Sequence, residues 1–326
     1  MKVLHVSESI KGGVSTYLNE LYKNKESYID FYSFLPKQHI KYIDVNYRSN
    51  VYLFDRGKRG IASFMSFIKF FNINIKKINP DIIFLHSTFA GFLVRFFYFF
   101  RFKRPKIIYC SHGWSFLMEV NYLKKKIYLI IEMILSLKTD IIINISNYDY
   151  KESMRLGIPE KKSVKILNNI NTSINNHDHK VLNYNKNKIN FLFVGRLDKQ
   201  KGFDFLLNFF KMNNKYILHV VGESVLNQEL FDNSLENVNF YGWINQNEIH
   251  NFYIESDVVI VPSRWEGFGL VCLEAMKYSK PILVSNRGAL PELVVDGVNG
   301  FIFDFDNFDS SLNKTIKNLE NIDLDY

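Results

Sequence analysis

The chain has 326 residues, a length at which one hydrophobic core rarely keeps growing, so two domains are expected. The composition, 47% hydrophobic and 23% charged, is that of a folded protein. Its two cysteines, Cys110 and Cys272, lie in opposite halves, which excludes a disulfide framework and fits a reducing cytoplasmic setting. The formal net charge of +8 favours anionic partners: nucleic acid, phosphorylated small molecules or an anionic membrane surface.

No segment is expected to cross a membrane or to act as a secretory signal. The most apolar region, residues 89–102, is interrupted by Arg95 and Arg101. Uninterrupted apolar runs fall short of the ~18 residues that a span requires. Met1 and Lys2 lead straight into a strand-like run instead of a signal peptide. Any membrane contact is therefore expected to be peripheral.

Short apolar runs alternate with helical patterns through the first half of the chain. The expected strands are 3–6, 31–35, 51–54, 81–85, 106–110 and 140–145. The expected helices begin at residue 17 and then cover 61–78, 89–102 and 122–137. Continuous apolar strands separated by helices indicate a parallel sheet that is covered on both faces.

A strongly polar segment follows, after which the alternation restarts. Residues 168–188 show no hydrophobic period, so we expect a linker at 171–188 between domains of residues 1–170 and 189–326. The strands expected in the second domain are 189–194, 217–221, 238–241, 257–261 and 282–284, and the helices are 203–211, 248–254 and 270–278. The fold class is therefore α/β, with two domains facing each other across a cleft and ligands at the carboxyl ends of the strands.

A pair of glycines lies between the first strand and the first helix. Gly12-Gly13-Val14 would let the backbone approach a ligand, and the N-terminus of the helix would offer unpaired N–H groups to an anion. Ser9 and Tyr17 stand where a G-x-G-x-x-G fingerprint needs glycine, which counts against a dinucleotide site. An ordinary strand-to-helix turn is an equally good interpretation of this segment alone.

The second half opens with a basic turn at the equivalent place. Within the segment 195–202, Arg196 and Lys201 lie beside the start of a helix and could together hold a diphosphate. Such cations would stabilise the negative charge that develops on a departing nucleoside diphosphate. The alternative is a solvated basic turn, which is a common feature of protein surfaces.

Two glutamates frame a glycine-containing loop in the segment 264–274. Glu266 lies on the loop that follows the strand at 257–261, and Glu274 lies just over one turn into the next helix. The backbone of Gly267-Phe268-Gly269-Leu270 suits a phosphate or a sugar hydroxyl, and Glu274 can accept hydrogen bonds from a ribose diol. The alternative is a helix whose early acidic residues favour its macrodipole.

Together these segments resemble one enzyme family. The segment 264–274 is similar to the E-x7-E signature of retaining glycosyltransferases of family 4, which adopt the GT-B fold of two Rossmann-like domains. The other motifs that resemble this family are Gly12-Gly13-Val14, Ser111-His112-Gly113, Gly195-Arg196-Leu197 with Lys201-Gly202, Val220-Val221-Gly222, Phe240-Tyr241-Gly242-Trp243 and the segment 281–303. They occur in order along nearly the whole chain, which makes the combination specific.

The resemblance implies a role for each matching residue. Arg196 and Lys201 would bind the donor diphosphate, and Glu274 would bind the ribose. Glu266 would contact the transferred sugar, and His112 would lie near the anomeric carbon or a sugar hydroxyl, so these two act in catalysis with the two cations. The other donor-binding positions that the resemblance implies are Gly13, Gly222, Trp243, Ile244, Phe268, Gly269 and Leu270.

The resemblance also implies a metal-independent reaction that retains the configuration of the transferred sugar, with the nucleotide sugar as co-substrate and no cofactor. The leaving phosphate would take the acceptor's proton, so no enzymic nucleophile is needed. Asp304-Phe305-Asp306 matches the D-x-D pair of metal-dependent enzymes, but it follows an apolar run and is interpreted as a loop after a strand.

The sequence departs from the family pattern at two places. Glu223 and Ser224 stand where many relatives have a second glycine after Gly222, so the resemblance does not define base recognition there. Relatives usually continue into a helix that crosses back to the first domain, whereas this sequence stops at Tyr326. Weaker packing between the domains or a naturally short C-terminus is therefore expected.

The acceptor is expected on the first domain. Aromatic residues at 92–100 accompany Arg95, Arg101, Lys103 and Arg104, and Lys124-Lys125-Lys126 precedes the apolar run 127–135. Such a surface suits attachment to an anionic bilayer, unless the aromatic helices are core and the lysines a solvated face. Attachment to the inner face of the membrane would fit a glycan or polyprenyl-diphosphate-linked acceptor, as in O-antigen, lipopolysaccharide, capsule or exopolysaccharide synthesis.

Two other functions compete with transfer. A nucleotide-sugar epimerase of the same fold would act on the donor alone, but the two glutamates combined with Arg196 and Lys201 favour transfer. A basic nucleic-acid-binding protein lacks support, because no helix-turn-helix, zinc or RNP pattern occurs, and we expect no nucleic-acid partner. Within the family a UDP-sugar is the commonest donor and a GDP-sugar is the alternative; the sequence does not identify the sugar.

Overall fold

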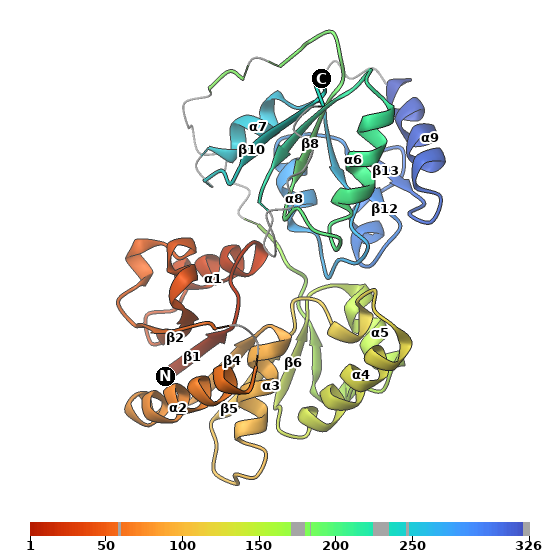
Figure 1. Ribbon diagram of the computed structural model, residues 1–326. Coiled ribbons are helices and arrows are strands. Elements are labelled where there is room, and N and C mark those ends of the chain that lie inside the picture. The colour runs from red at the N-terminus through yellow and green to blue at the C-terminus, as the bar shows by residue number, and fades with distance from the viewer. Residues whose placement is uncertain (58–59, 171–179, 183, 224–234, 246–247, 322–326) are drawn as a thin grey trace. The chain divides into compact units, whose positions relative to one another are not determined.

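The structure is a computed structural model that describes the chain except for residues 58–59, 171–179, 183, 224–234, 246–247 and 322–326 (Figure 1). Its contacts divide the chain into two compact units, Met1–Leu167 and Asn168–Tyr326. Much of the linker expected at 171–188 lies outside the described residues. In the described part of the chain, no helix combines the length and apolar character needed to cross a bilayer.

The described residues of the first unit form one parallel seven-stranded sheet in the order β3-β2-β1-β4-β5-β6-β7. Its strands are β1 (Lys2–Ser7), β2 (Asp30–Pro36), β3 (Val51–Phe54), β4 (Ile82–His86), β5 (Lys106–Cys110), β6 (Ile141–Asn144) and β7 (Ser163–Lys165). The chain places β2 and β3 on one side of β1 and then returns to add β4 on the other side. Ligands of such sheets bind at the carboxyl ends of the strands where the order reverses, here between β1 and β4.

Helices cover both faces of this sheet. They are α1 (Gly13–Lys23), α2 (Ile61–Ile78), α3 (Thr88–Phe97), α4 (Tyr122–Ser136) and α5 (Asn147–Arg155), with short 3-10 turns at Lys37–Tyr42, Val45–Tyr47, Ser115–Leu117 and Glu160–Lys162. Successive residues of β1 point to opposite faces. Leu4 and Val6 join the core that α2 and α3 cover, whereas the His5 ring contacts the ring of Tyr22 on α1.

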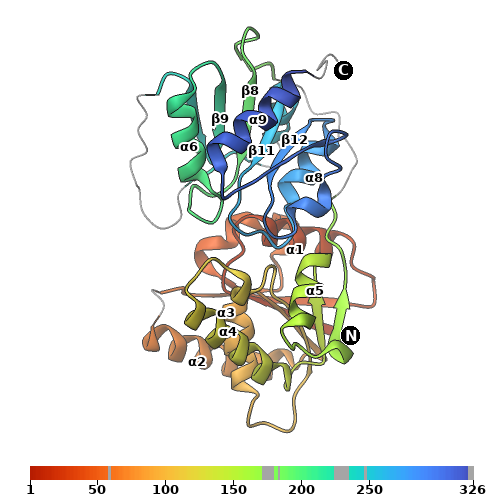
Figure 2. The same cartoon turned by 90° about the vertical axis from the view of Figure 1, so that its right-hand side faces the viewer.

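The described residues of the second unit form a parallel six-stranded sheet in the order β10-β9-β8-β11-β12-β13. Its strands are β8 (Asn190–Val194), β9 (Ile217–Val221), β10 (Val238–Gly242), β11 (Val258–Val261), β12 (Ile282–Ser285) and β13 (Gly300–Phe303). Its helices are α6 (Phe203–Met212), α7 (Ile249–Glu255), α8 (Leu270–Lys277) and α9 (Phe308–Glu320), with a 3-10 turn at Leu290–Leu293. Helices α6 and α9 lie on the same face (Figure 2), and α7 and α8 contribute to the core on the other. Here the order reverses between β8 and β11.

Two parallel-sheet Rossmann-like units confirm the predicted α/β class. The strands 51–54, 106–110 and 217–221 and the helix 61–78 have the bounds that we predicted. The main errors concern helices: α1 begins at Gly13 instead of 17, and the expected helix 89–102 ends at Phe97, after which turn hydrogen bonds from the N–H groups of Phe99 and Arg101 replace the helical ones.

Helix α5 escaped prediction because its sequence is polar and lacks an apolar period. A capping signal marks its start, since Ser146 accepts a hydrogen bond from the backbone N–H of Asp149 at 3.0 Å. Ser-x-x-Asp spacing could have indicated this helix from the sequence.

The structure corrects part of the expected basic-aromatic surface. Arg95 is fully buried, pairs with Glu132 of α4 at 2.7 Å and lies 3.8 Å from the centre of the Tyr109 ring. The Tyr109 hydroxyl group donates to the other carboxylate oxygen of Glu132 at 3.0 Å. Phe97 and Tyr98 are also buried. These residues hold α3 and α4 against β5, so of the two interpretations left open for them by the sequence, the core is correct and a binding surface is not.

Removing the buried guanidinium group should destabilise the chain strongly. We expect Arg95→Met to lower the free energy of unfolding by about 3–5 kcal/mol, because it leaves the Glu132 carboxylate buried without a counter-charge. Urea unfolding followed by circular dichroism would measure this change.

The double variant Arg95→Met/Glu132→Gln is the matched control. It should unfold at a higher urea concentration than Arg95→Met, because a neutral amide is cheaper to bury than an unpaired carboxylate and can still accept the Tyr109 hydroxyl proton. Equal midpoints for the single and double variants would contradict a charge-pairing role.

Candidate donor site and histidine cluster

The turn between β8 and α6 carries the two predicted cations. Its start is tied to β9, because the backbone N–H of Gly195 donates to the Val221 carbonyl oxygen at 3.0 Å. Arg196 donates to Gln200 Oε1 at 2.5 Å and lies 3.3 Å from Asp198 Oδ2. Its side chain remains 36% exposed, so the guanidinium group is oriented by the turn and still accessible to an anion.

The loop after β11 packs closely against this turn. Gly202 has φ of 69°, and a Cβ atom there would lie 1.8 Å from the Pro262 carbonyl oxygen, so only glycine fits. Arg264 donates to both carboxylate oxygens of Asp204 at 2.6 and 2.8 Å, a bidentate pair across the two segments. The backbone N–H of Arg264 also donates to the Gln200 carbonyl oxygen at 2.8 Å. The two loops at the switch point are therefore held together by several direct contacts.

This packing brings together two charged residues from different motifs. Lys201 Nζ lies 2.5 Å from Glu266 Oε2, and the Ser263 hydroxyl group donates to the same oxygen at 3.3 Å. The side chains are 20% and 13% exposed, so the pair is only partly open to water. The cation predicted to hold the diphosphate thus pairs with the carboxylate predicted to contact the sugar.

The start of α8 supplies the other carboxylate. Gly269 caps the helix with φ of 100°, Leu270 is its first residue, and the Phe268 side chain is buried. Glu274 Oε2 accepts a hydrogen bond from the Tyr253 hydroxyl group at 2.6 Å. Burial raises the pKa of Glu274, and this hydrogen bond opposes the rise because it favours the carboxylate.

The expected base-contacting loops adjoin the same turn. A Cβ atom on Gly222 would lie 1.8 Å from the Gly195 carbonyl oxygen, and the Gly222 N–H donates to the Gly242 carbonyl oxygen at 2.8 Å. Trp243, 40% exposed, and Ile244, packed on the core, follow at the end of β10. The carbonyl oxygen of Glu223 accepts from the Leu197 N–H at 3.1 Å, whereas Ser224 lies outside the described residues.

Gly13 and His112 belong to the first unit, whereas the other predicted site residues belong to the second. Gly12, with φ of 77°, turns the chain so that α1 begins at Gly13. His112 has φ of 53° and its ring meets the Tyr17 ring edge-on at 4.9 Å between centres. Its Nε2 lies 3.1 Å from Nδ1 of His86. Burial lowers the pKa of His112 to about 4, so the imidazole is neutral at physiological pH.

The aspartates of the D-x-D segment make hydrogen bonds and an ion pair with neighbouring side chains. Asp304 accepts hydrogen bonds from the side-chain amides of Asn286 at 2.9 Å and Asn307 at 2.6 Å, and Asp306 pairs with Arg287. These contacts stabilise the loop after β13. Over the described ranges, no group of three or more His, Cys, Asp or Glu side chains could hold a metal ion.

Several residues of the site were not found from the sequence. Asp204 and Arg264 join the two loops, and Tyr253 orients Glu274. The position of Arg264 at the start of the two-glutamate segment was a usable signal. No pattern in the sequence links Tyr253 to Glu274, because they lie on different helices.

Comparisons with known proteins identify the family. A family profile described as "Glycosyltransferase Family 4" matches residues 11–174, and one described as "Glycosyl transferases group 1" matches residues 175–325. An uncharacterized 41.2 kDa protein in the cps region of Klebsiella pneumoniae is 39% identical over 94% of this chain and 87% of its own length. The O-antigen biosynthesis glycosyltransferase WbnH of Escherichia coli is 33% identical over 72% of this chain and 68% of its own length.

A third relative and two solved structures are also similar to this chain. The Escherichia coli protein named UDP-Gal:alpha-D-GlcNAc-diphosphoundecaprenol alpha-1,3-galactosyltransferase is 28% identical over 74% of this chain and 67% of its own length. Sucrose-phosphate synthase from Thermosynechococcus elongatus has a TM-score of 0.77 at 18% identity, covering 98% of this chain and 89% of that protein. Anabaena HepE in complex with UDP-glucose has a TM-score of 0.72 at 17% identity, covering 98% and 91%.

The two family profiles together span nearly the whole chain, and WbnH exceeds 30% identity over most of its length. The structural neighbours share the GT-B fold. This chain is therefore a GT-B glycosyltransferase and belongs to glycosyltransferase family 4.

Proposed function

We propose that this glycosyltransferase transfers a sugar from a UDP-sugar to a lipid-linked glycan with retention of configuration and without a metal ion. We place this reaction in the synthesis of O-antigen, capsule or a related polysaccharide at the inner face of the membrane. The observation that carries the proposal is the contact between Lys201 and Glu266 beside Arg196, at the carboxyl ends of β8 and β11.

The cations would act on the departing diphosphate. Arg196 and Lys201 carry fixed positive charge where a bound nucleotide would leave, so they would stabilise the transition state more than the ground state. A diphosphate that approaches Lys201 would compete with Glu266 for the ammonium group. Glu266, once released, would be available to accept a hydrogen bond from a hydroxyl group of the sugar.

Glu274 suits the ribose. The Tyr253 hydroxyl group occupies Oε2 and fixes the orientation of the carboxyl group, so Oε1 would accept from the ribose diol. A carboxylate that is partly withdrawn from water and already oriented binds a diol with little further loss of side-chain freedom.

The names of related proteins support the choice of substrates. One relative is named as a UDP-Gal transferase acting on a diphosphoundecaprenol-linked sugar, and the HepE structure holds UDP-glucose. A GDP-sugar donor is the alternative within the same site. An epimerase would need no acceptor, so a measured transfer product would exclude it.

Nucleotide binding tests the site. We expect Lys201→Ala and Glu274→Ala each to weaken UDP binding about 10- to 100-fold, because each removes charge-assisted hydrogen bonds worth about 1.5–3 kcal/mol. Isothermal titration calorimetry with UDP and the purified full chain would measure both dissociation constants.

Two further variants sharpen this test. Lys199→Ala removes an exposed cation from the same turn and should leave UDP binding unchanged. Glu266→Ala should bind UDP at least as tightly as the wild type, because it frees Lys201, but should lose transfer. Wild-type affinity in both Lys201→Ala and Glu274→Ala would refute the site assignment.

A surface on the first unit supports the membrane part of the proposal. One side of α4 packs on the core through Tyr128, Leu129 and Leu135, yet the opposite side is also apolar. Five exposed apolar side chains follow one another along α4 and its C-terminal cap at alternating intervals of four and three residues, namely Leu123 67%, Ile127 45%, Ile130 54%, Ile134 46% and Leu137 67%. This spacing forms one stripe along the helix, and Lys124, Lys125 and Lys126 lie beside its start.

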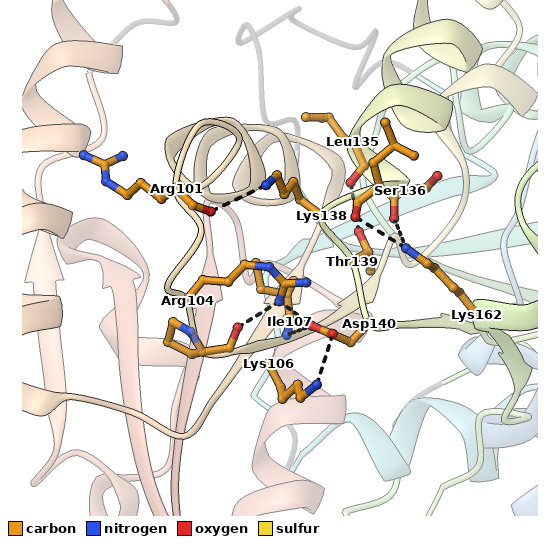
Figure 3. Close-up of polar contacts among 12 residues, drawn as sticks. Arg101, Arg104, Lys106, Ile107, Leu135, Ser136, Lys138, Thr139, Asp140 and Lys162 are labelled. Carbon is orange, nitrogen blue, oxygen red and sulfur yellow. Dashed lines mark hydrogen bonds and ion pairs between the residues drawn. The ribbon is translucent and has the colours of Figure 1, made fainter.

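A second apolar group lies next to the end of the stripe. Phe100 is 81% exposed and Phe102 is 100% exposed, on the loop between α3 and β5. Lys138 contacts the Arg101 carbonyl oxygen at 3.5 Å, and Arg104 pairs with Asp140, which follows α4 (Figure 3). These contacts hold the loop between α3 and β5 beside the C-terminal end of α4. The apolar groups with adjacent lysines and arginines suit insertion into an anionic bilayer.

Membrane binding has a direct test. We expect the wild type to float with vesicles of phosphatidylglycerol and phosphatidylethanolamine, and less so at high salt, because ionic attraction to the anionic lipid is screened. Leu123→Ser/Ile130→Ser combined with Phe100→Ser/Phe102→Ser should lower the bound fraction by about tenfold or more, since apolar burial is lost.

The control for this test is Met212→Ser, which removes a side chain that is 82% exposed on the second unit. It should float like the wild type. Failure of the wild type to bind anionic vesicles would contradict the proposal that this surface binds membranes. A dimer detected by light scattering, and dissociated by the α4 substitutions, would also contradict it.

A further inference from the structure

Three histidine rings form a row at the switch point of the first sheet. His5 lies on β1, His86 is the last residue of β4, and His112 follows β5. His5 Nδ1 is 3.0 Å from His86 Nε2, and His86 Nδ1 is 3.1 Å from His112 Nε2. Both nitrogens of His86 are therefore engaged, and each neighbour contributes one nitrogen.

Burial keeps all three rings neutral. It lowers the pKa of His5 to about 3 and that of His112 to about 4, and it holds the pKa of His86 well below the usual value. A neutral imidazole has one N–H donor and one bare nitrogen acceptor. His86 must therefore donate to one neighbour and accept from the other, so both hydrogen bonds run in the same direction.

The inner end of the row determines that direction. His5 is 1% exposed, and its Nε2 has no hydrogen-bond partner among the described residues. The aromatic rings of Tyr22, Phe31 and Phe84 surround it. Hydrogen bonds running inward would end in a buried N–H group without an acceptor, an arrangement that folded proteins avoid. Hydrogen bonds running outward leave a bare nitrogen there and end in a proton on His112 Nδ1.

We propose that His5 and His86 are positioning residues that hold His112 in the Nδ1–H tautomer, so that His112 presents a hydrogen-bond donor to an oxygen atom of the substrate. Nδ1 of His112 makes no hydrogen bond to any described residue, and the edge-on ring of Tyr17 fixes the plane of the imidazole. The assignment of the substrate contact, unlike the tautomer, rests on the proposed function.

The row holds a tautomer and does not conduct protons. Proton conduction would need an exit at His5 Nε2, which is enclosed by aromatic rings and has no hydrogen-bond partner among the described residues. In water a free histidine side chain prefers the Nε2–H tautomer. Loss of the His86 hydrogen bond should therefore return His112 to Nε2–H and turn its Nδ1 from a donor into an acceptor.

Nitrogen NMR of the full chain labelled with 15N-histidine tests the tautomer without any substrate. The His112 signals are assigned by their absence in His112→Gln. We expect the wild type to carry the proton on Nδ1 of His112 at neutral pH, and His86→Phe to shift it to Nε2. A wild-type His112 protonated on Nε2 would overturn the proposal even if His86→Phe failed to fold.

Two further variants separate positioning from packing. His86→Asn retains an N–H donor near the position of Nδ1 and should restore the Nδ1–H tautomer. Tyr17→Phe keeps the ring contact with His112 and should leave the tautomer unchanged. If His86→Phe and His86→Asn both kept the wild-type tautomer, His86 would not control His112.

The rate of sugar transfer, measured with UDP-galactose as the probe donor, gives the functional readout. His86→Phe should lower kcat about 10- to 100-fold and leave KM for the donor unchanged. His86→Asn should recover most of the lost kcat. An equal loss in both variants would indicate a packing role and contradict positioning. UDP affinity in calorimetry should match the wild type, because UDP binding is assigned to the second unit. Absence of UDP binding by the wild type would count against the proposed function and leave the tautomer result intact.

Discussion

The close approach of Gly202 to the carbonyl group of Pro262 is the constraint on which the candidate donor site depends. Because no side chain separates the two loops, the turn after β8 packs against the loop after β11, and the bidentate contact of Arg264 with Asp204 holds them together. Lys201 can then meet Glu266, although the two residues are far apart in the sequence. A larger residue at position 202 would separate the loops and divide the site.

Both units place their polar groups where the strand order reverses, but with different chemistry. In the second unit, cations and carboxylates share a partly exposed surface, which suits an exchange of partners when a diphosphate binds. In the first unit, three neutral imidazoles are stacked into the sheet, which suits a fixed hydrogen-bonding pattern. Charge that must respond to a ligand stays accessible, and groups that must hold one state are buried.

The sequence predicted helices and strands well where packing produces a simple hydrophobic pattern. It predicted poorly those features that depend on contacts between residues far apart in the chain. Strands such as 106–110 were predicted with correct bounds because they are continuous apolar runs between turn signals. The sequence left open whether Arg95 lies on a surface or in the core, because its partner, Glu132, lies on another helix and cannot be paired with it from sequence. The motif residues Lys201 and Glu266 were found individually, but their contact depends on the reversed strand order. His5 and His86 carried no signal, since a single histidine within or at the end of a buried strand is more often structural than functional.

We infer that a bound donor diphosphate takes Lys201 from Glu266. A crystal structure of the full chain with bound UDP would show whether this exchange occurs. In that structure we expect the terminal phosphate to contact the ammonium group of Lys201 and the guanidinium group of Arg196, Glu274 to contact the ribose, and Lys201 no longer to pair with Glu266. UDP bound elsewhere, with the Lys201–Glu266 pair intact, would contradict it.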